Sequence, residues 1–213
     1  MQQEEQNQET HGKIEVILQA AQRRLGLYGY EKTTMKEIAD DISMSKAALY
    51  YYFTDKDAIF KAVVEREQKE FSALIEKKIA ELDNPEEMVK VYIDQRMRYF
   101  REFMNLSKFR STEPEQVKPL LKELFFRFRL EEQKLLVKIL KIGNSSGQFH
   151  CENEELYADL FLNIVKGLRF SLIQQKPYIE LAPEELEVLV NAFHDFTTLF
   201  IRGLKYNESK YYK

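Results

Sequence analysis

Six side chains that can contact phosphates or the edges of bases lie close together in this sequence. They are Lys36, Ser45, Lys46, Ala48, Tyr50 and Tyr51. Hydroxyl and ammonium groups donate hydrogen bonds to phosphate oxygens, a lysine suits the edge of a guanine, and an alanine methyl suits that of a thymine. These residue types predict binding to double-stranded DNA, provided that the chain presents them on one surface.

Two short helices would present these side chains. Thr34 and Glu37 match the capping box that begins a helix, and Ser45 can cap a second helix reaching about Tyr52. With a break over residues 42–44, this is the geometry of a helix-turn-helix, whose second helix enters the major groove. The side chains expected to pack the two helices together are Ile38, Ala39, Ile42, Leu49 and Phe53. The alternative is that the hairpin is only a structural corner.

The run from Thr33 to Phe60 resembles the signature of the TetR family of bacterial transcriptional repressors. The residues that fall on the family's pattern are Thr34, Ile38, Ala39, Ser45, Leu49, Tyr50, Tyr52, Phe53, Lys56 and Ile59. The resemblance implies that Thr34 and Lys56 contact phosphates and that the recognition helix reaches phosphate or sugar through Tyr50 and Tyr51. The positions from which it implies base contacts are Lys36, Lys46 and Ala48.

Two positions depart from the family's pattern. Ser43 stands where the family usually has glycine, and a positive φ there would cost about 1 kcal/mol. Ala47 and Ala48 replace the more common Gly-Thr, which removes a hydroxyl donor. We therefore expect base reading to depend on Lys46, methyl contacts and phosphates.

The whole chain has the pattern of an all-α protein. Glycine and proline number only seven and five among 213 residues, and apolar residues recur with helical spacing. The Gly-Asn-Ser-Ser-Gly run at 143–147 predicts a loop. The long helices are expected over 12–28, 55–82, 85–106, 115–142, 156–175 and 184–204. The expected parts are a disordered arm (1–11), a three-helix helix-turn-helix domain (12–56), a larger helical ligand-binding and dimerisation domain (57–206) and a frayed tail (207–213).

The charge and cysteine content of the chain limit its possible partners, location and metal sites. The formal net charge is -3, and segment 12–53 carries six Lys and Arg against five Asp and Glu side chains, so charge does not by itself favour nucleic acid. A single cysteine, the lack of a signal-peptide pattern and the lack of a long apolar run indicate a cytoplasmic protein. His150 and Cys151 lack a second ligand pair at a recognisable spacing, so no metal site or cofactor is expected.

The middle of the chain is rich in aromatic residues and methionine. The resemblance implies a mostly apolar ligand pocket there, whereas such stripes are also typical of an ordinary helical core. The candidate pocket residues are Tyr92, Met97, Phe100, Phe103, Met104, Phe125 and Phe128. Arg96, Arg98 and Arg101 could present a charge to an acidic ligand, but a solvated helix face is the expected role.

The last two expected helices are apolar over much of their circumference, so each must be covered on two sides. A four-helix bundle made of two helices from each of two subunits explains this width. The alternative is burial within one subunit. The residues expected at the dimer interface are Leu160, Ile164, Leu168, Val188, Ala192, Phe196 and Leu199.

Together these features predict a ligand-responsive repressor that binds a near-palindromic operator as a homodimer and is released by a small apolar inducer. Co-repression by the ligand stays open. No paired carboxylates, Cys/His dyad or glycine-rich phosphate loop supports an enzyme. The alternative function is a helical protein-interaction adaptor that does not bind DNA.

Overall fold

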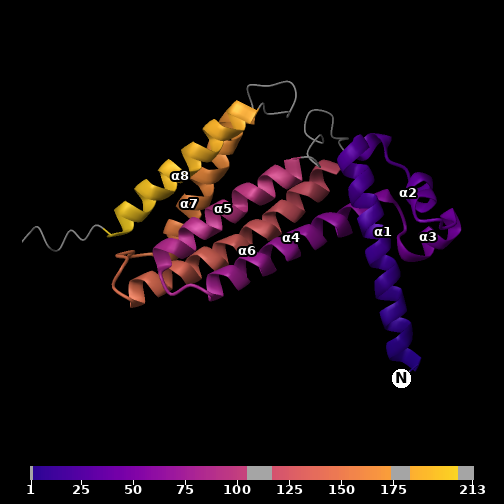
Figure 1. Ribbon diagram of the computed structural model, residues 1–213, viewed down its shortest axis with the longest axis horizontal. Helices are drawn as coiled ribbons and strands as arrows, with labels where there is room; N and C mark the ends of the chain where they lie inside the picture. Colours follow the sequence, from indigo (N-terminus) through magenta and orange to yellow (C-terminus); the bar gives the residue numbers. More distant parts are fainter. Residues whose placement is uncertain (1, 105–116, 174–182, 206–213) are drawn as a thin grey trace, which may run out of the picture. The chain divides into compact units, whose positions relative to one another are not determined.

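The described residues, 2–104, 117–173 and 183–205, form eight α-helices and no strand in the computed structural model (Figure 1). The expected all-α fold is therefore confirmed. No helix in these ranges has a stretch long and apolar enough to cross a bilayer. The helices are α1 (Gln2–Lys32), α2 (Met35–Asp41), α3 (Lys46–Tyr52), α4 (Lys56–Ala80), α5 (Pro85–Met104), α6 (Val117–Ser145), α7 (Glu154–Ile173) and α8 (Pro183–Lys205).

The start of α1 differs from the expectation. Residues 2–11 are helical and not a disordered arm. Glutamine and glutamate are good helix formers, and Glu9 pairs with Lys13 one turn later, with 2.7 Å between Oε1 and Nζ. Near the other end, Gly29 has φ 80° and ψ 172°, which bends the chain before the last residues of α1. Glycine adopts this φ without strain.

The described residues fall into two compact units. The first contains residues 2–69, 102–104 and 117–124, and the second contains 70–101 with the rest of the described chain. The chain passes from one unit to the other within α4, α5 and α6. The expected boundary at residues 56/57 separates a DNA-binding segment from a ligand-binding segment. It is a division by function, and it stays a prediction. The expected tail, 207–213, lies outside the described residues.

The first unit holds the predicted helix-turn-helix. In it α2 and α3 pack beside α1 (Figure 1). Ile38 and Leu49 are fully buried, and Ala39 is 1 % exposed, so the inward face of the hairpin is largely as expected. The side chains of α1 and α4 that complete this core are Ile17, Leu25, Ile59 and Val63.

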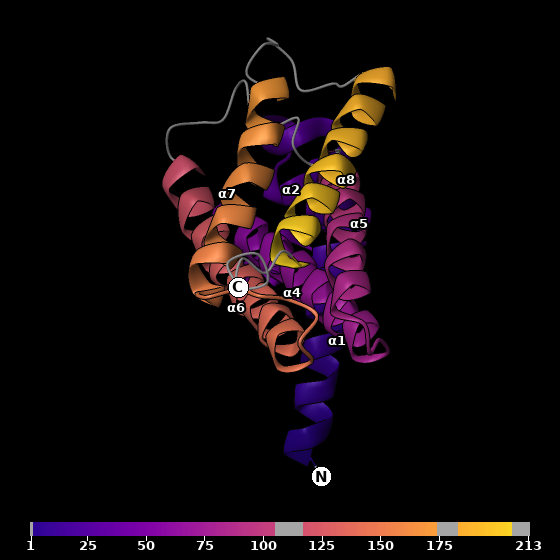
Figure 2. The same ribbon diagram turned by 90° about the vertical axis from the view of Figure 1, so that its left-hand side faces the viewer.

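The second unit ends in the pair α7 and α8, which lie side by side (Figure 2). Phe161 of α7 is fully buried, and its ring centroid lies 5.1 Å from that of Phe196 and 4.9 Å from that of Phe200. Leu189 and Phe193 of α8 are also buried. Other large apolar side chains of this helix pair are exposed, as described below.

Candidate nucleic-acid interface

The two short helices begin at the predicted caps. The Thr34 hydroxyl oxygen accepts a hydrogen bond from the Glu37 amide at 3.3 Å, and Glu37 Oε2 accepts one from the Thr34 amide at 2.9 Å. This is a complete capping box. Ser45 Oγ accepts a hydrogen bond from the Ala48 amide at 3.1 Å. Both caps satisfy amides that would otherwise lack a partner, and both predictions are confirmed.

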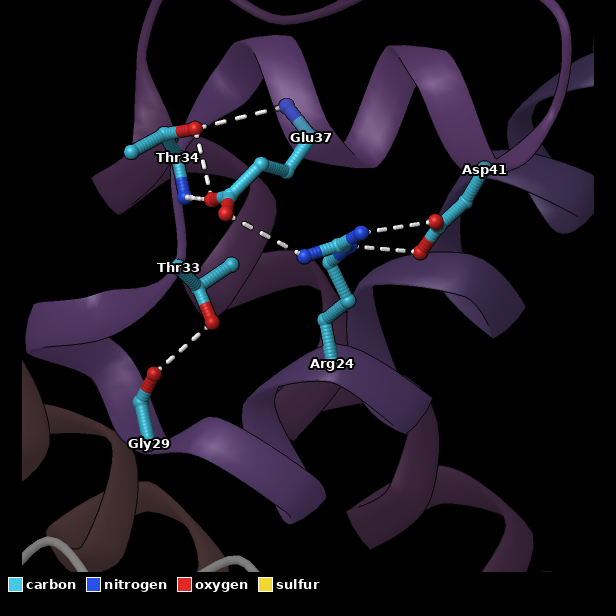
Figure 3. Close-up of polar contacts among 6 residues, drawn as sticks. All are labelled: Arg24, Gly29, Thr33, Thr34, Glu37 and Asp41. Atoms are coloured by element: carbon cyan, nitrogen blue, oxygen red, sulfur yellow. Dashed lines mark hydrogen bonds and ion pairs between the residues drawn. The ribbon is translucent and has the colours of Figure 1, made fainter.

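A side chain of α1 holds α2 in place. Arg24 lies between Glu37 and Asp41 of α2, with Nε 2.6 Å from Asp41 Oδ2 and Nη1 3.4 Å from Glu37 Oε1 (Figure 3). The hydrogen bonds from Arg24 lower the pKa of Asp41, and the Thr34 hydroxyl and then the Thr34 amide lower the pKa of Glu37. Two acidic groups of the motif thus share one arginine, a pairing that a count of charges cannot reveal.

The turn between the helices contains the expected backbone strain. Ser43 has φ 53°, in the left-handed region that glycine adopts freely. The Ser43 amide donates a hydrogen bond to the Asp40 backbone carbonyl at 3.1 Å, and the Met44 amide donates one to the Ala39 carbonyl at 2.9 Å. These bonds close the end of α2, so the turn keeps its form without glycine.

The exposed side of α3 carries the predicted recognition residues. Tyr51 is 83 % exposed and Tyr50 is 44 % exposed, whereas the neighbouring Leu49 is buried in the core. Lys46 is exposed, with Nζ 5.6 Å from the centre of the Tyr50 ring. The predicted DNA-contacting residues of the hairpin that are exposed are Lys36, Ser45, Lys46, Tyr50 and Tyr51, and Ala48 is half-buried.

Two residues expected to contact phosphate have protein partners. Lys56 donates a hydrogen bond to the Tyr30 carbonyl at 2.8 Å, and its Nζ lies 3.9 Å from the centre of the Tyr30 ring. Burial lowers the pKa of Lys56. The Thr34 hydroxyl donates to Glu37 Oε2 at 2.7 Å. The Tyr30 hydroxyl also bonds Asp57, so Tyr30 fastens the end of α1 to the start of α4, a role that the sequence analysis missed.

Comparison with known proteins agrees with this geometry. A family model described as bacterial regulatory proteins of the tetR family matches residues 17–63. A solved transcriptional regulator from Cytophaga hutchinsonii is 32% identical, with a TM-score of 0.83, and the match covers 92% of this chain and 100% of that one. The HTH-type transcriptional regulator YvkB of Bacillus subtilis is 23% identical over 188 residues, which are 88% of this chain and 95% of that protein.

The chain belongs to the TetR family of bacterial transcriptional regulators. As a TetR-family regulator it is not an enzyme, and proteins of this family bind DNA and typically dimerise. A shorter match joins it to the HTH-type transcriptional repressor Rv1474c of Mycobacterium tuberculosis, which is 36% identical over 58 residues, 27% of this chain and 31% of that protein.

The candidate pocket residues lie mostly in the interior of the second unit. Tyr92, Met97, Phe100 and Phe128 are buried, and Phe125 is half-buried. The side chains of Phe103 and Met104 lie outside the described residues. Burial is compatible with both a pocket wall and an ordinary core, so the pocket assignment stays a prediction.

One feature of this interior corrects the sequence analysis. Arg96, expected on a solvated face, has a side chain only 16% exposed, and its Nε lies 2.5 Å from Oε1 of Glu132, whose side chain is 6% exposed. The Tyr92 hydroxyl, fully buried, donates to the same oxygen at 2.7 Å. Burial and then the Glu132 charge raise the pKa of Tyr92 well above its ordinary value.

The expected dimer residues are divided between exposed and half-buried positions. Leu160, Val188 and Leu199 are 48%, 59% and 65% exposed. The half-buried members are Ile164, Leu168, Ala192 and Phe196. These helices therefore keep large apolar side chains uncovered within one subunit.

Proposed function

We propose that this TetR-family regulator is a repressor that binds a near-palindromic operator as a homodimer and is released by a small molecule. The observation that carries the proposal is the exposed surface of α3. Exposed tyrosines beside an exposed lysine, on a short capped helix that is anchored in the core by Leu49, suit insertion into the major groove.

In this proposal α3 supplies most of the contacts. Lys46 reaches a base edge, and Tyr50 and Tyr51 reach phosphate or sugar, with Lys36 adding a contact from α2. Thr34 and Lys56 play smaller parts than the family resemblance implied, because both are already bonded to the protein. An ammonium group has three N–H donors, so Lys56 can still offer two to a phosphate.

The dimer of the proposal forms through α7 and α8. Exposed leucine and valine side chains on both helices are costly in water, and a second copy of the same surface would cover them. A two-fold dimer then presents two α3 helices to successive major grooves about 34–36 Å apart or somewhat more.

Release by a ligand requires that the ligand prefers one spacing of the two α3 helices. Helix α4 is a candidate for the coupling because it is one continuous helix whose two ends belong to different units. We propose that the ligand binds in the second unit, and that the usual effect is induction. The proposed location of the protein is the cytoplasm.

The test of this function is operator selection from random duplexes with the full-length protein, followed by a screen for small molecules that release the complex. The proposal expects a selected sequence with two inverted half-sites and retention that falls steeply with salt. Absence of any enriched sequence, or salt-insensitive behaviour, would support the adaptor that does not bind DNA.

A further inference from the structure

The interior of the second unit contains a charged cluster, formed by Tyr92, Arg96 and Glu132, which we call the Arg96 cluster. Arg96 belongs to α5 and Glu132 to α6. The Arg96 guanidinium carbon lies 5.2 Å from the centre of the Phe128 ring, 5.8 Å from that of Tyr99 and 6.0 Å from that of Phe71. The cluster is therefore bordered by aromatic rings, one of which belongs to the candidate pocket.

The acceptors around Arg96 are fewer than its donors. A guanidinium carries five N–H donors. Glu132 offers Oε1, which also accepts the Tyr92 hydroxyl, and Tyr92 is itself a hydrogen-bond partner of Arg96. Although Arg96 Nε lies 2.5 Å from that oxygen, it is buried without a hydrogen bond of ordinary geometry to a described residue. Among the described residues, Glu132 and Tyr92 offer fewer acceptors than the guanidinium has donors, so the cluster favours a ligand that supplies further acceptors.

The positive charge of the arginines near the candidate pocket suits an anionic ligand. A second guanidinium, that of Arg169, lies 5.4 Å from the centre of the Phe100 ring. Burial opposes the charge on Arg96, but attraction to Glu132 raises the pKa of Arg96 above its ordinary value. The guanidinium therefore stays charged, and its planar fork matches a carboxylate.

We propose that the effector of this regulator is an amphipathic carboxylic acid whose carboxylate binds Arg96 and whose apolar part packs on the rings of Phe71, Tyr99 and Phe128. The inference rests on the proposed function, since it names the chemical class of the ligand. Glu132 keeps its place on the Nε side of Arg96, and the ligand takes the terminal nitrogens.

The chain itself shows an arginine that holds two carboxylates. Arg24 contacts both Asp41 and Glu37 through different nitrogens. A cationic ligand fits the cluster less well, because Arg96 already lies over the aromatic faces. A competing cation would displace Arg96 and leave a buried guanidinium without its pairing.

The experiment compares ligands that share one apolar body and differ only in the charge of the head group. Decanoate, decanamide and decyltrimethylammonium, each below its micellar concentration, are titrated into the full-length protein by calorimetry. A second pair, 4-phenylbutanoate and its amide, varies the body. In at least one pair we expect the acid to bind roughly tenfold or more tightly than its amide, the usual strength of a charge-assisted arginine contact.

Variants test whether the preference for acid over amide depends on the Arg96 cluster. Arg96→Gln combined with Glu132→Gln removes both charges without leaving one unpaired, and we expect it to abolish the preference for acid over amide. Arg129→Gln is the matched control, because Arg129 pairs with Asp159 at 2.8 Å with both side chains part-exposed. It should keep the preference. Circular dichroism and the thermal midpoint check that each variant is folded.

Several results would overturn the inference. They are equal binding of acid and amide, tighter binding of the trimethylammonium compound, absence of binding by both acids, and a preference that survives in a folded double variant. Because calorimetry uses the protein without DNA, these results do not depend on operator binding. Failure of the proposed function would instead appear as failure to select an operator.

Discussion

Ser43 shows how one residue can depart from a pattern and still keep the structure. Its left-handed backbone closes the turn between α2 and α3, and the backbone hydrogen bonds of the turn are formed despite the strain. A side chain in this region costs about 1 kcal/mol relative to glycine. The motif therefore carries a small, localised loss of stability.

Replacing Ser43 by glycine should remove that loss. We expect Ser43→Gly to raise the free energy of unfolding by up to about 1 kcal/mol, less the entropy that glycine adds to the unfolded chain. Ser43→Ala, which keeps the β-carbon, should give no increase. Urea unfolding followed by circular dichroism measures both, and an equal gain from alanine would contradict the strain argument.

Arg24 predicts a dependence of stability on pH. The pKa values of Asp41 and Glu37 lie below their ordinary values of 3.8 and 4.5 in the folded protein. Lowered carboxylate pKa values contribute stability that is complete above those ordinary values and is lost as pH falls through the folded values. We expect Arg24→Gln to lower stability at pH 7 and to make its decline towards pH 3 smaller.

Urea titrations at pH 7 and pH 3 measure this prediction. Arg202→Gln, an exposed arginine of α8 for which no ion pair with a described residue is found, is the control and should keep the decline of the parent. A decline unchanged in Arg24→Gln would show that Asp41 gains nothing from Arg24.

Local contacts could be predicted from sequence, and distant ones could not. The caps at Thr34 and Ser45 join residues three positions apart, so their residue types reveal them. Arg24 and Asp41 are 17 positions apart, and Tyr92 and Glu132 are 40 apart. No periodic pattern encodes such pairs, because they depend on how helices pack.

At the end of α6 the chain forms helix where a loop was expected. The Gly-Asn-Ser-Ser-Gly run favours a turn, but α6 continues to Ser145. The reason lies in tertiary packing, since the buried Phe149 ring folds back onto Gly143, and Asn144 bonds both the amide and the carbonyl of Cys151. Burial also raises the pKa of the Cys151 thiol to about 11, so it is a packing residue rather than a reactive one.

Gly143 should not tolerate a larger side chain. A β-carbon added there would lie 2.0 Å from Cδ2 of Phe149, so the buried ring would have to move. We expect Gly143→Ala to lower the free energy of unfolding by about 1–3 kcal/mol. Gly12→Ala is the control, because Gly12 is helical with nothing within 4 Å of such an atom. It should be neutral or stabilising by up to about 1 kcal/mol.

Thermal and urea unfolding of both glycine variants measure the difference. If Gly143→Ala were as stable as the parent, the close approach of Phe149 to α6 would be incorrect. If both variants lost stability equally, a general effect of substituting helical glycines would replace the packing argument.

For the whole molecule, the apolar surface of α7 and α8 predicts self-association. Val188→Glu with Leu199→Glu places charges on two of its most exposed apolar positions, and we expect a monomer at micromolar concentration. Val16→Glu changes a similarly exposed apolar residue of α1, at 49% exposure, and should leave the dimer intact. Analytical ultracentrifugation measures both. A parent protein that sediments as a monomer would contradict the dimer and the palindromic operator.

The order of the long helices followed from periodicity and caps, whereas the chemistry inside the second unit did not. Apolar spacing predicted α5 to α8 within a few residues of their observed ends. The same spacing cannot separate a pocket wall from a core, because both bury aromatic faces. Arg96 illustrates the limit, since an arginine on a helix usually faces water, and its burial depends on packing against α4 and α6.

The central claim is that α3 reads DNA, and the affinity of its variants for a selected operator tests it most directly. Fluorescence anisotropy at fixed salt compares the parent with Lys46→Ala and Tyr50→Phe, and with Lys134→Ala as a control on an exposed lysine of α6. We expect Lys46→Ala to weaken binding about tenfold and Tyr50→Phe several-fold, as for the loss of a base contact and a phosphate contact. The control should bind like the parent. If Lys46→Ala and Tyr50→Phe both retain the affinity of the parent, α3 is not the helix that reads DNA.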